Sequence, residues 1–254
     1  MIEFTKMQAA GNDYVYIDCR RGIDFKPEKL ARAISRRHYG VGADGIILIC
    51  RSDSADAKMR IFNSDGTEAM MCANGIRCVA KWLYDRGQTG SRAQIETLSG
   101  ILPVAVNGDT VTVDMGVAAF AQPMKLRLGD EEYEYLPVNV GNSHACFFGD
   151  MTTLPLTEIG ARLDHIFNTE IVTAIDKTRL RVAVYESGSG LTLSCGSGAC
   201  ASVYAASQRD IVPRGEDISV EMPGGVLTVN VGDTVTLSSE VHEVYTGQYA
   251  YDDQ

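Results

Sequence analysis

Two cysteines stand in matching, turn-rich surroundings about half the chain length apart. Cys72 opens the sequence Cys-Ala-Asn-Gly, and Cys195 opens Cys-Gly-Ser-Gly. Each follows a strand-like run and a glycine-containing loop, and each precedes a run that is typical of a helix. Backbone N–H groups at a helix start bind carboxylate or phosphate, and the helix dipole there favours thiolate over thiol. Both positions are therefore candidates for a thiolate base or nucleophile.

Two thiols in such positions support two classes of chemistry. One class is redox, in which a disulfide opens and closes. The other is acid–base: one thiolate removes a proton from a carbon and the opposite thiol returns one to the other face, which inverts a stereocentre. Helix N-termini would hold the α-carboxylate of the substrate and offset charge that builds up on it. Each cysteine also needs a partner that sets its protonation, and His144 and Glu186 are the loop-borne candidates.

The elements that carry the cysteines repeat along the chain. Strands are predicted at 59–62 and 180–185 before the two loops, and helices at 76–86 and 199–207 after them. Such a long repeat is read as two copies of one domain rather than a solenoid. Strand-rich halves, each with one central helix, favour an α+β fold over a doubly wound parallel sheet. The remaining predicted elements are strands at 4–7, 14–17, 46–50, 94–115, 171–174, 218–222, 226–231 and 235–245, helices at 27–38 and 156–163, and an irregular segment at 115–137.

Composition narrows the class of protein. The net charge of −10 disfavours nucleic-acid and anionic-membrane partners. No apolar run approaches the roughly 18 residues that span a bilayer, and the start of the sequence lacks a signal-peptide layout. We therefore expect a cytoplasmic protein with no membrane partner. Seven cysteines in such a chain make a disulfide framework improbable, and no histidine stands at zinc-ligand spacing. We expect the other five cysteines, Cys19, Cys50, Cys78, Cys146 and Cys200, to be inert core residues.

The sequence resembles the diaminopimelate epimerase family over essentially the whole chain. The longest landmark, residues 62–78, runs from Phe-Asn-Ser-Asp-Gly to Cys-Ala-Asn-Gly-Ile-Arg-Cys. Four further landmarks occur in the family's order: residues 10–13, 141–144, 195–198 and 222–225.

The resemblance implies two pseudo-symmetric α+β domains, each a strand-rich sheet around a central helix, with the active site in the cleft between them. We place the domains at 1–117 and 118–254, allowing for a C-terminal strand that crosses over. The resemblance also implies no pyridoxal phosphate or other cofactor, no metal, a homodimer, and inversion at the α-carbon of a free amino acid. It pairs Cys72 with His144, and Cys195 with Glu186. The expected substrate-binding residues are Asn12, Asn63, Ala73, Asn74, Gly75, Asn142, Asn168, Ser187, Gly196 and Ser197.

One loop departs from the family pattern. The family commonly has Glu-Arg-Gly-x-Gly-Glu-Thr before the second cysteine, whereas residues 186–192 read Glu-Ser-Gly-Ser-Gly-Leu-Thr. Ser187 replaces the arginine that grips the far carboxylate of diaminopimelate, and serine cannot supply its charge. Leu191 replaces a glutamate. We therefore expect a racemase for an amino acid other than diaminopimelate, with histidine as the best guess.

Two alternatives remain. The first is an ordinary diaminopimelate epimerase whose far contact has moved to another residue, and Arg77 and Arg181 are the positions to examine. The second is a non-catalytic thiol-redox or ligand-binding protein.

Overall fold

The computed structural model describes residues 1–251, which form two compact units. The first unit holds Met1–Val113 and the segment from Glu240 onward, and the second holds Asp114–Ser239. The last strand belongs to the first unit because it pairs antiparallel with the first strand of the chain. Among the described residues, no helix has both the length and the apolar character needed to cross a membrane.

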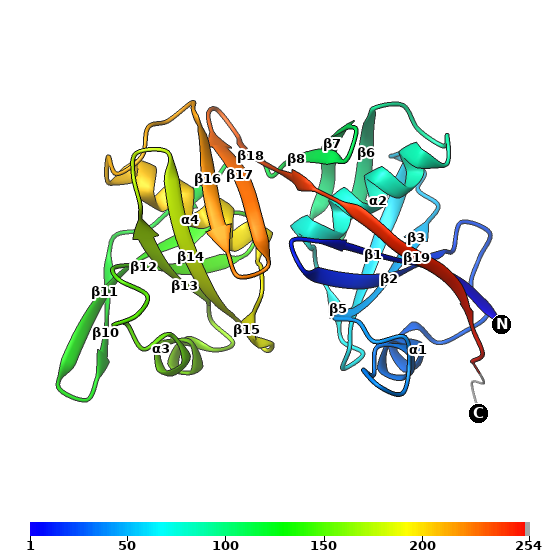
Figure 1. Ribbon diagram of the computed structural model, residues 1–254, viewed down its shortest axis with the longest axis horizontal. Coiled ribbons are helices and arrows are strands. Elements are labelled where there is room, and N and C mark those ends of the chain that lie inside the picture. Colours follow the sequence, from blue (N-terminus) through cyan, green and yellow to red (C-terminus); the bar gives the residue numbers. More distant parts are fainter. Residues whose placement is uncertain (252–254) are drawn as a thin grey trace. The chain divides into compact units, whose positions relative to one another are not determined.

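The first unit contains two helices and most of the strands of the N-terminal half, coloured blue to green in Figure 1, together with the red C-terminal strand. Its elements are β1 (Ile2–Ala9), β2 (Asn12–Asp18), α1 (Pro27–Ile34), β3 (Gly45–Cys50), β4 (Ala57–Asn63), β5 (Glu68–Ala69), α2 (Ala73–Asp85), β6 (Arg92–Thr97), β7 (Gly100–Asn107), β8 (Thr110–Asp114) and β19 (His242–Tyr249).

The second unit has the corresponding composition of two helices and a strand-rich sheet. Its elements are β9 (Ala119–Phe120), β10 (Met124–Leu128), β11 (Glu131–Asn139), β12 (Ser143–Phe148), α3 (Leu156–Leu163), β13 (Asn168–Ala174), β14 (Arg179–Glu186), β15 (Gly190–Thr192), α4 (Gly196–Gln208), β16 (Asp217–Met222), β17 (Gly225–Val231) and β18 (Val235–Glu240).

The two units share one strand-pairing scheme. In the first, β1–β2 is antiparallel, β2–β3 parallel, β3–β4 antiparallel, β4–β6 parallel and β6–β7–β8 antiparallel. In the second, β11–β12–β13–β14–β16–β17–β18 follows the same alternation. The shared scheme confirms the predicted α+β fold with its internal repeat.

A helix lies at the centre of each unit and explains the residue types there. α4 packs against β11, β12, β13, β14, β16 and β17, so it is buried on nearly all sides. Its small residues, Gly, Ala, Ser and Cys, allow strands to approach it closely. Helix α2 packs against β1, β2, β6 and β7 in the same way (Figure 1). Between α2 and β1, the buried Trp82 indole N–H donates to Thr5 Oγ1 at 3.0 Å.

Both central helices begin three residues earlier than the apolar pattern predicts, at Ala73 and Gly196. The early start makes Cys72 and Cys195 the N-cap residues. The segment 115–137 was expected to be irregular, and this expectation is wrong. Strands β10 and β11 pair there as a ribbon with Lys125 bonded to Glu132. Residues 124–128 alternate apolar and charged side chains, which is the period of a strand and could have indicated it.

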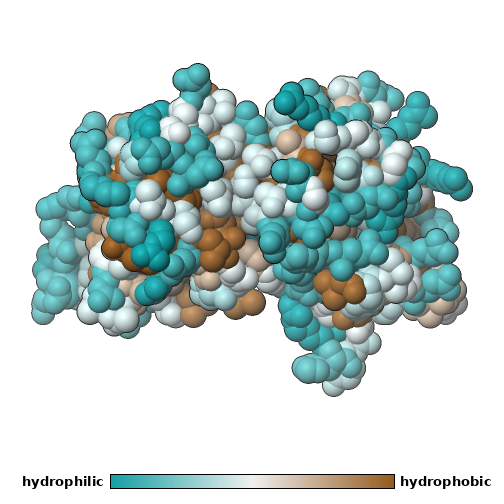
Figure 2. Space-filling view, turned by 45° about the horizontal axis from the view of Figure 1, so that its top comes forward, coloured by the Kyte–Doolittle hydropathy of each residue, from teal (hydrophilic) through white to brown (hydrophobic). Residues whose placement is uncertain are grey.

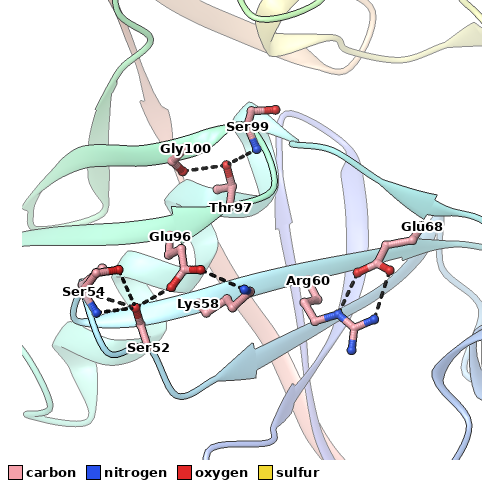
Figure 3. A network of polar contacts seen from close by, with 10 residues as sticks. Ser52, Ser54, Lys58, Arg60, Glu68, Glu96, Thr97, Ser99 and Gly100 are labelled. Carbon is pink, nitrogen blue, oxygen red and sulfur yellow. Dashed lines mark hydrogen bonds and ion pairs between the residues drawn. The ribbon is translucent and has the colours of Figure 1, made fainter.

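Ion pairs join β4 to its neighbours β5 and β6 (Figure 3). Arg60 donates to both carboxylate oxygens of Glu68, at 2.7 and 3.0 Å, and so joins β4 to β5 just before that loop. Glu96 accepts from Lys58 at 2.8 Å and from Ser52, which joins β6 to β4. Bidentate arginine–carboxylate contacts add geometric specificity, so they define the path of the chain into Cys72.

Hydrophobic atoms are exposed in separate patches among polar ones in the space-filling view (Figure 2). Exposed apolar side chains precede each cysteine in the sequence: Met70 is 59% exposed, and Leu191 and Leu193 are 61% and 54% exposed. Single exposed apolar residues are normal on proteins.

Candidate active site

Each of the two cysteines caps its central helix with its sulfur. Cys72 has extended backbone angles, and its Sγ accepts the Gly75 N–H at 3.3 Å. Cys195 has nearly the same angles, and its Sγ accepts the Gly198 N–H at 3.4 Å. N-cap positions usually hold a serine or aspartate oxygen in this role. Neither helix has an acidic residue in its first turn, so the positive end of each dipole faces the thiol.

Asn12 lies against the first cysteine. Its Oδ1 accepts from Cys72 Sγ at 3.5 Å, and its Nδ2 donates to Asp44 at 2.7 Å. Asn12 is therefore in direct contact with the Cys72 thiol. Its role in binding substrate stays a prediction.

The other predicted binding residues of the first unit flank the start of α2. Ala73, Asn74 and Gly75 form its buried first turn, where backbone N–H groups lack helical partners. Asn63 lies at the end of β4 and donates to Thr67 Oγ1 at 3.1 Å. Backbone N–H groups at a helix start can bind an anion, and the role of these residues toward a substrate carboxylate stays a prediction.

Glu186 lies beside Cys195 in the second unit, within hydrogen-bonding reach of its thiol. Burial raises the pKa of Glu186, and hydrogen bonds from Thr192 and Cys195 oppose that rise. Burial and the nearby Glu186 and Glu170 carboxylates raise the pKa of the Cys195 thiol well above its ordinary value. Two adjacent buried anions are costly, so each of these groups disfavours the ionised form of the other. The predicted pairing of Cys195 with Glu186 as acid–base partners stays a prediction.

His144 is fully buried beside Glu170. Its Nδ1 lies 2.7 Å from Glu170 Oε1, and its Nε2 lies 2.9 Å from Asn142 Oδ1. A doubly protonated imidazole satisfies both acceptors. In the neutral tautomer with its proton on Nδ1, the ring instead accepts at Nε2 from the NH2 group of a reversed Asn142 amide. Glu170 and Asn142 therefore hold the ring from its two nitrogen atoms. The pairing of His144 with Cys72 stays a prediction, because these residues belong to different units.

Ser187 is held in a polar network that contains a carboxylate. Its N–H donates to Asn168 Oδ1 at 3.0 Å, and its Oγ donates to Asp164 Oδ1 at 3.1 Å. The Gly188 N–H also donates to Asp164, at 2.9 Å, and such bonds hold the pKa of Asp164 below its ordinary value. The position expected to bind a far carboxylate thus has an anion beside it.

The sequence suggested Arg77 and Arg181 as possible replacements for the arginine that binds the far carboxylate of diaminopimelate. In the structure each of them already has partners within its own unit. Arg77 is fully buried in α2, where it donates to Ala73 O at 3.0 Å and to the Asn74 side chain. Arg181 donates to Glu221 at 2.9 Å on the exposed side of β14. Both guanidinium groups are engaged within the fold.

Sequence reasoning missed Glu170 and Asp44. Glu170 interrupts the apolar strand β13 and is fully buried, and a lone carboxylate in such a strand is itself a signal of a buried polar partner. It also underlies α4, because a Cβ on Gly198 would lie 2.6 Å from Glu170 Oε1. Asp44 lies in the glycine-rich loop before β3, where an aspartate is ordinary turn chemistry and so gives no sign of a functional contact. Within residues 1–251, no group of three or more His, Cys, Asp or Glu residues is arranged to hold a metal ion.

The raised pKa of Glu186 predicts a pH-dependent stability. A carboxyl group whose pKa is higher in the folded protein stabilises it fully below the unfolded pKa, and this contribution is lost as pH rises through the folded pKa. Glu186→Gln keeps an acceptor for Thr192 and cannot ionise. We expect its Tm to exceed that of the wild type at neutral pH, with the difference closing toward about pH 4. A difference that is constant with pH would contradict this origin.

The fold is shared with solved two-unit structures of several families. A probable proline racemase of Agrobacterium radiobacter superposes with a TM-score of 0.79 at 13% identity, covering 99% of this chain and 94% of that chain. A phenazine biosynthesis protein of Bacillus anthracis superposes with a TM-score of 0.77 at 16% identity, covering 98% of this chain and 99% of that chain. At these identities the likeness shows the fold alone.

Sequence comparison narrows the class to one family. The diaminopimelate epimerase family model matches residues 4–121 and 138–251. The diaminopimelate epimerase of Geobacillus kaustophilus is 40% identical over 281 residues, covering 98% of this chain and 96% of the relative. That of Bacteroides thetaiotaomicron is 43% identical over 242 residues, covering 90% and 89%. The chain belongs to the diaminopimelate epimerase family, as its sequence landmarks predicted, and is an isomerase of the epimerase and racemase type.

Proposed function

We propose that the chain inverts the α-carbon of a free amino acid with Cys72 and Cys195 as its two catalytic groups, without a cofactor. The repeated N-cap geometry carries this proposal: each sulfur accepts a helix N–H, and each lies beside backbone amides that suit an α-carboxylate. A merely structural cysteine does not require this arrangement twice.

The proposed reaction balances without any external oxidant or reductant. One thiolate takes the α-proton, so a C–H bond breaks and an S–H bond forms. The opposite thiol gives its proton to the other face of the carbon, so an S–H bond breaks and a C–H bond forms. The proposal requires both sulfurs to reach the same α-carbon from opposite faces. The carboxylate charge that develops would be offset by the N-termini of α2 and α4.

The names of the relatives support diaminopimelate as the substrate, and we take it as the first candidate. Relatives with about 40% identity over nearly the whole chain are named diaminopimelate epimerases. Diaminopimelate has a second ammonium group as well as a second carboxylate, and Asp164 offers a charge of the sign that an ammonium group requires.

A specific observation favours a second candidate, an amino acid with one carboxylate such as histidine. Ser187 stands where the family commonly has an arginine, and its hydroxyl is bonded to the Asp164 carboxylate. A resident anion repels a second carboxylate, whereas a neutral or basic side chain would not meet this repulsion. Histidine remains our best guess for this class.

Separate assays on diaminopimelate and a panel of L-amino acids distinguish the candidates. The reduced protein is incubated with each compound in D₂O, and loss of the α-proton signal is followed by NMR. Exchange with diaminopimelate supports the first candidate, and exchange with one monocarboxylic amino acid supports the second. Exchange with none of these compounds would contradict both.

Restoring arginine at position 187 tests the basis of that choice. If the natural substrate has one carboxylate, Ser187→Arg should raise kcat/KM for diaminopimelate, because a bidentate charged contact contributes about 2 kcal/mol, or roughly thirtyfold. It should lower activity on the natural substrate. The matched control is Ser189→Arg, in the same exposed loop. If diaminopimelate is natural and well bound, the substitution should give no gain.

A further inference from the structure

We propose that Asp44 is a positioning residue that turns the Asn12 amide so that its oxygen, rather than its NH2 group, faces the Cys72 sulfur. The inference rests on the function proposed above, since it concerns the proton affinity of one of the two thiols. Its geometry lies entirely within the first unit.

Hydrogen bonds fix the direction of the Asn12 amide. Its Nδ2 donates to Asp44 Oδ2 at 2.7 Å, and the Asp13 N–H donates to the same oxygen at 3.1 Å. An asparagine side chain has one donor end and one acceptor end, so holding the NH2 group at Asp44 also fixes where the oxygen points. That oxygen accepts from Cys72 Sγ at 3.5 Å.

Arg37 pairs with both Asp44 and Asp13, and Lys6 pairs with Asp13 alone. Burial and the Asp13 charge raise the pKa of Asp44, and the contacts from the Asp13 N–H, Asn12 and Arg37 oppose that rise. Arg37 donates to Asp44 Oδ1 at 3.1 Å and to Asp13 Oδ1 at 3.0 Å. Lys6 is 5% exposed, pairs with Asp13 Oδ2 at 2.5 Å and donates to Gly42 O. Burial alone would raise the pKa of Asp13, but Lys6 and Arg37 bring it below its ordinary value. The buried Lys6–Asp13 pair thus lies next to the Asp44–Asn12 contact and helps to hold it in place.

The Cys72 sulfur consequently receives two opposing influences. The Gly75 N–H at 3.3 Å and the positive end of α2 favour the thiolate. The Asn12 oxygen can accept a hydrogen bond only from the protonated thiol and therefore favours the thiol. If the amide were reversed, its NH2 group would donate to the sulfur and favour the thiolate as well. The direction of this amide therefore sets the proton affinity of Cys72.

Other titratable groups near this thiol must be separated from the effect of Asp44. The charged or titratable side chains facing the Asn12–Cys72 contact come from β1, β2, the loop before β3 and α2: Lys6, Asp13, Tyr14, Tyr16, Arg37, Asp44 and Cys78. Because Asp44 itself carries a negative charge, its removal would lower the Cys72 pKa by electrostatics alone. The test must therefore distinguish charge from orientation.

The experiment measures alkylation of Cys72 as a function of pH. The full-length, reduced protein without substrate is treated with iodoacetamide, and the modification of each cysteine is quantified by mass spectrometry. The proteins compared are the wild type, Asp44→Ala, Asp44→Asn, Asn12→Ala and the double variant Asn12→Ala/Asp44→Ala. Alkylation needs no catalysis, so this test stands or fails separately from the proposed function.

We expect Asp44→Ala to lower the apparent pKa of Cys72 and to raise its alkylation rate near pH 7 about three- to tenfold. Asp44→Asn should shift the profile less than Asp44→Ala, because it loses the charge but its amide oxygen can still accept from Asn12 and hold the amide direction. Asn12→Ala should also raise the rate, and adding Asp44→Ala to it should give a smaller increase than Asp44→Ala gives alone, since only the charge effect is left.

Four results would overturn the inference. The first is an Asp44→Ala profile that matches the wild type. The second is an Asp44→Asn shift as large as that of Asp44→Ala, which would mean that charge alone acts. The third is an equal Asp44→Ala shift in the Asn12→Ala background. The fourth is faster alkylation that extends to the fully buried Cys78 of the same helix, which would assign Asp44 a general structural role.

Discussion

Replacing either Cys72 or Cys195 by serine is expected to lower turnover by about 10³-fold or more. A serine hydroxyl ionises far less readily than a thiol, so it can neither remove the α-proton nor return one at a useful rate. The fold should persist, because serine is among the best N-cap residues and can accept the Gly75 or Gly198 N–H in place of the sulfur.

The measurement pairs kcat/KM of each serine variant with its thermal unfolding. Cys78→Ser is the matched control, since Cys78 lies on the same helix and the proposed reaction does not use it. A Tm near that of the wild type with activity lost in both Cys72→Ser and Cys195→Ser supports the two-thiol reaction. Near-normal activity in both variants would contradict the two-thiol reaction.

Removing the Glu170 carboxylate should have the largest effect on stability. Glu170→Ala leaves His144 fully buried without its 2.7 Å partner and opens a cavity beneath α4. Breaking a buried pair by deleting one partner costs about 3–5 kcal/mol of unfolding free energy. Turnover should also fall, because the His144 ring loses the group that orients it. Denaturant unfolding and steady-state kinetics measure the two effects.

Two further variants show whether the effect comes from the buried pair. Glu170→Gln retains an acceptor for His144 Nδ1 and should be less destabilising than Glu170→Ala. Glu158→Ala removes an exposed carboxylate from α3 in the same unit and should change stability by less than about 0.5 kcal/mol. If Glu170→Ala were as mild as Glu158→Ala, the buried pair would not support this unit.

The sequence predicts the fold well where apolar patterns are strong. The strand at 46–50 is a continuous apolar run, and Ile46–Ile49 are all fully buried in the structure. The helix at 156–163 has the bounds of α3. The ribbon of β10 and β11 escaped prediction although residues 124–128 alternate in the period of a strand, and most of β10 is exposed. Local pattern is a weak guide where a strand buries little surface.

The candidate site is predictable in its residues but less so in its contacts. Cys72 and Cys195 can be singled out because their surroundings repeat, and Glu186 because it precedes the second loop. The roles of Glu170 and Asp44 depend on pairings between segments distant in the sequence, such as β12 with β13. No local spacing encodes those contacts. Asp164 is a similar case, because its link to Ser187 becomes visible only in the folded unit.

Deuterium incorporation during the earliest turnovers tests the two-thiol inversion most directly. The reduced enzyme is given an enantiomerically pure substrate in D₂O, and both stereoisomers are isolated at low conversion for NMR and mass spectrometry. The proposed reaction predicts deuterium at the α-carbon of the inverted product, while unreacted substrate keeps its protium. An inverted product that keeps the original protium, or substrate that exchanges faster than it inverts, would indicate a single base and contradict the account.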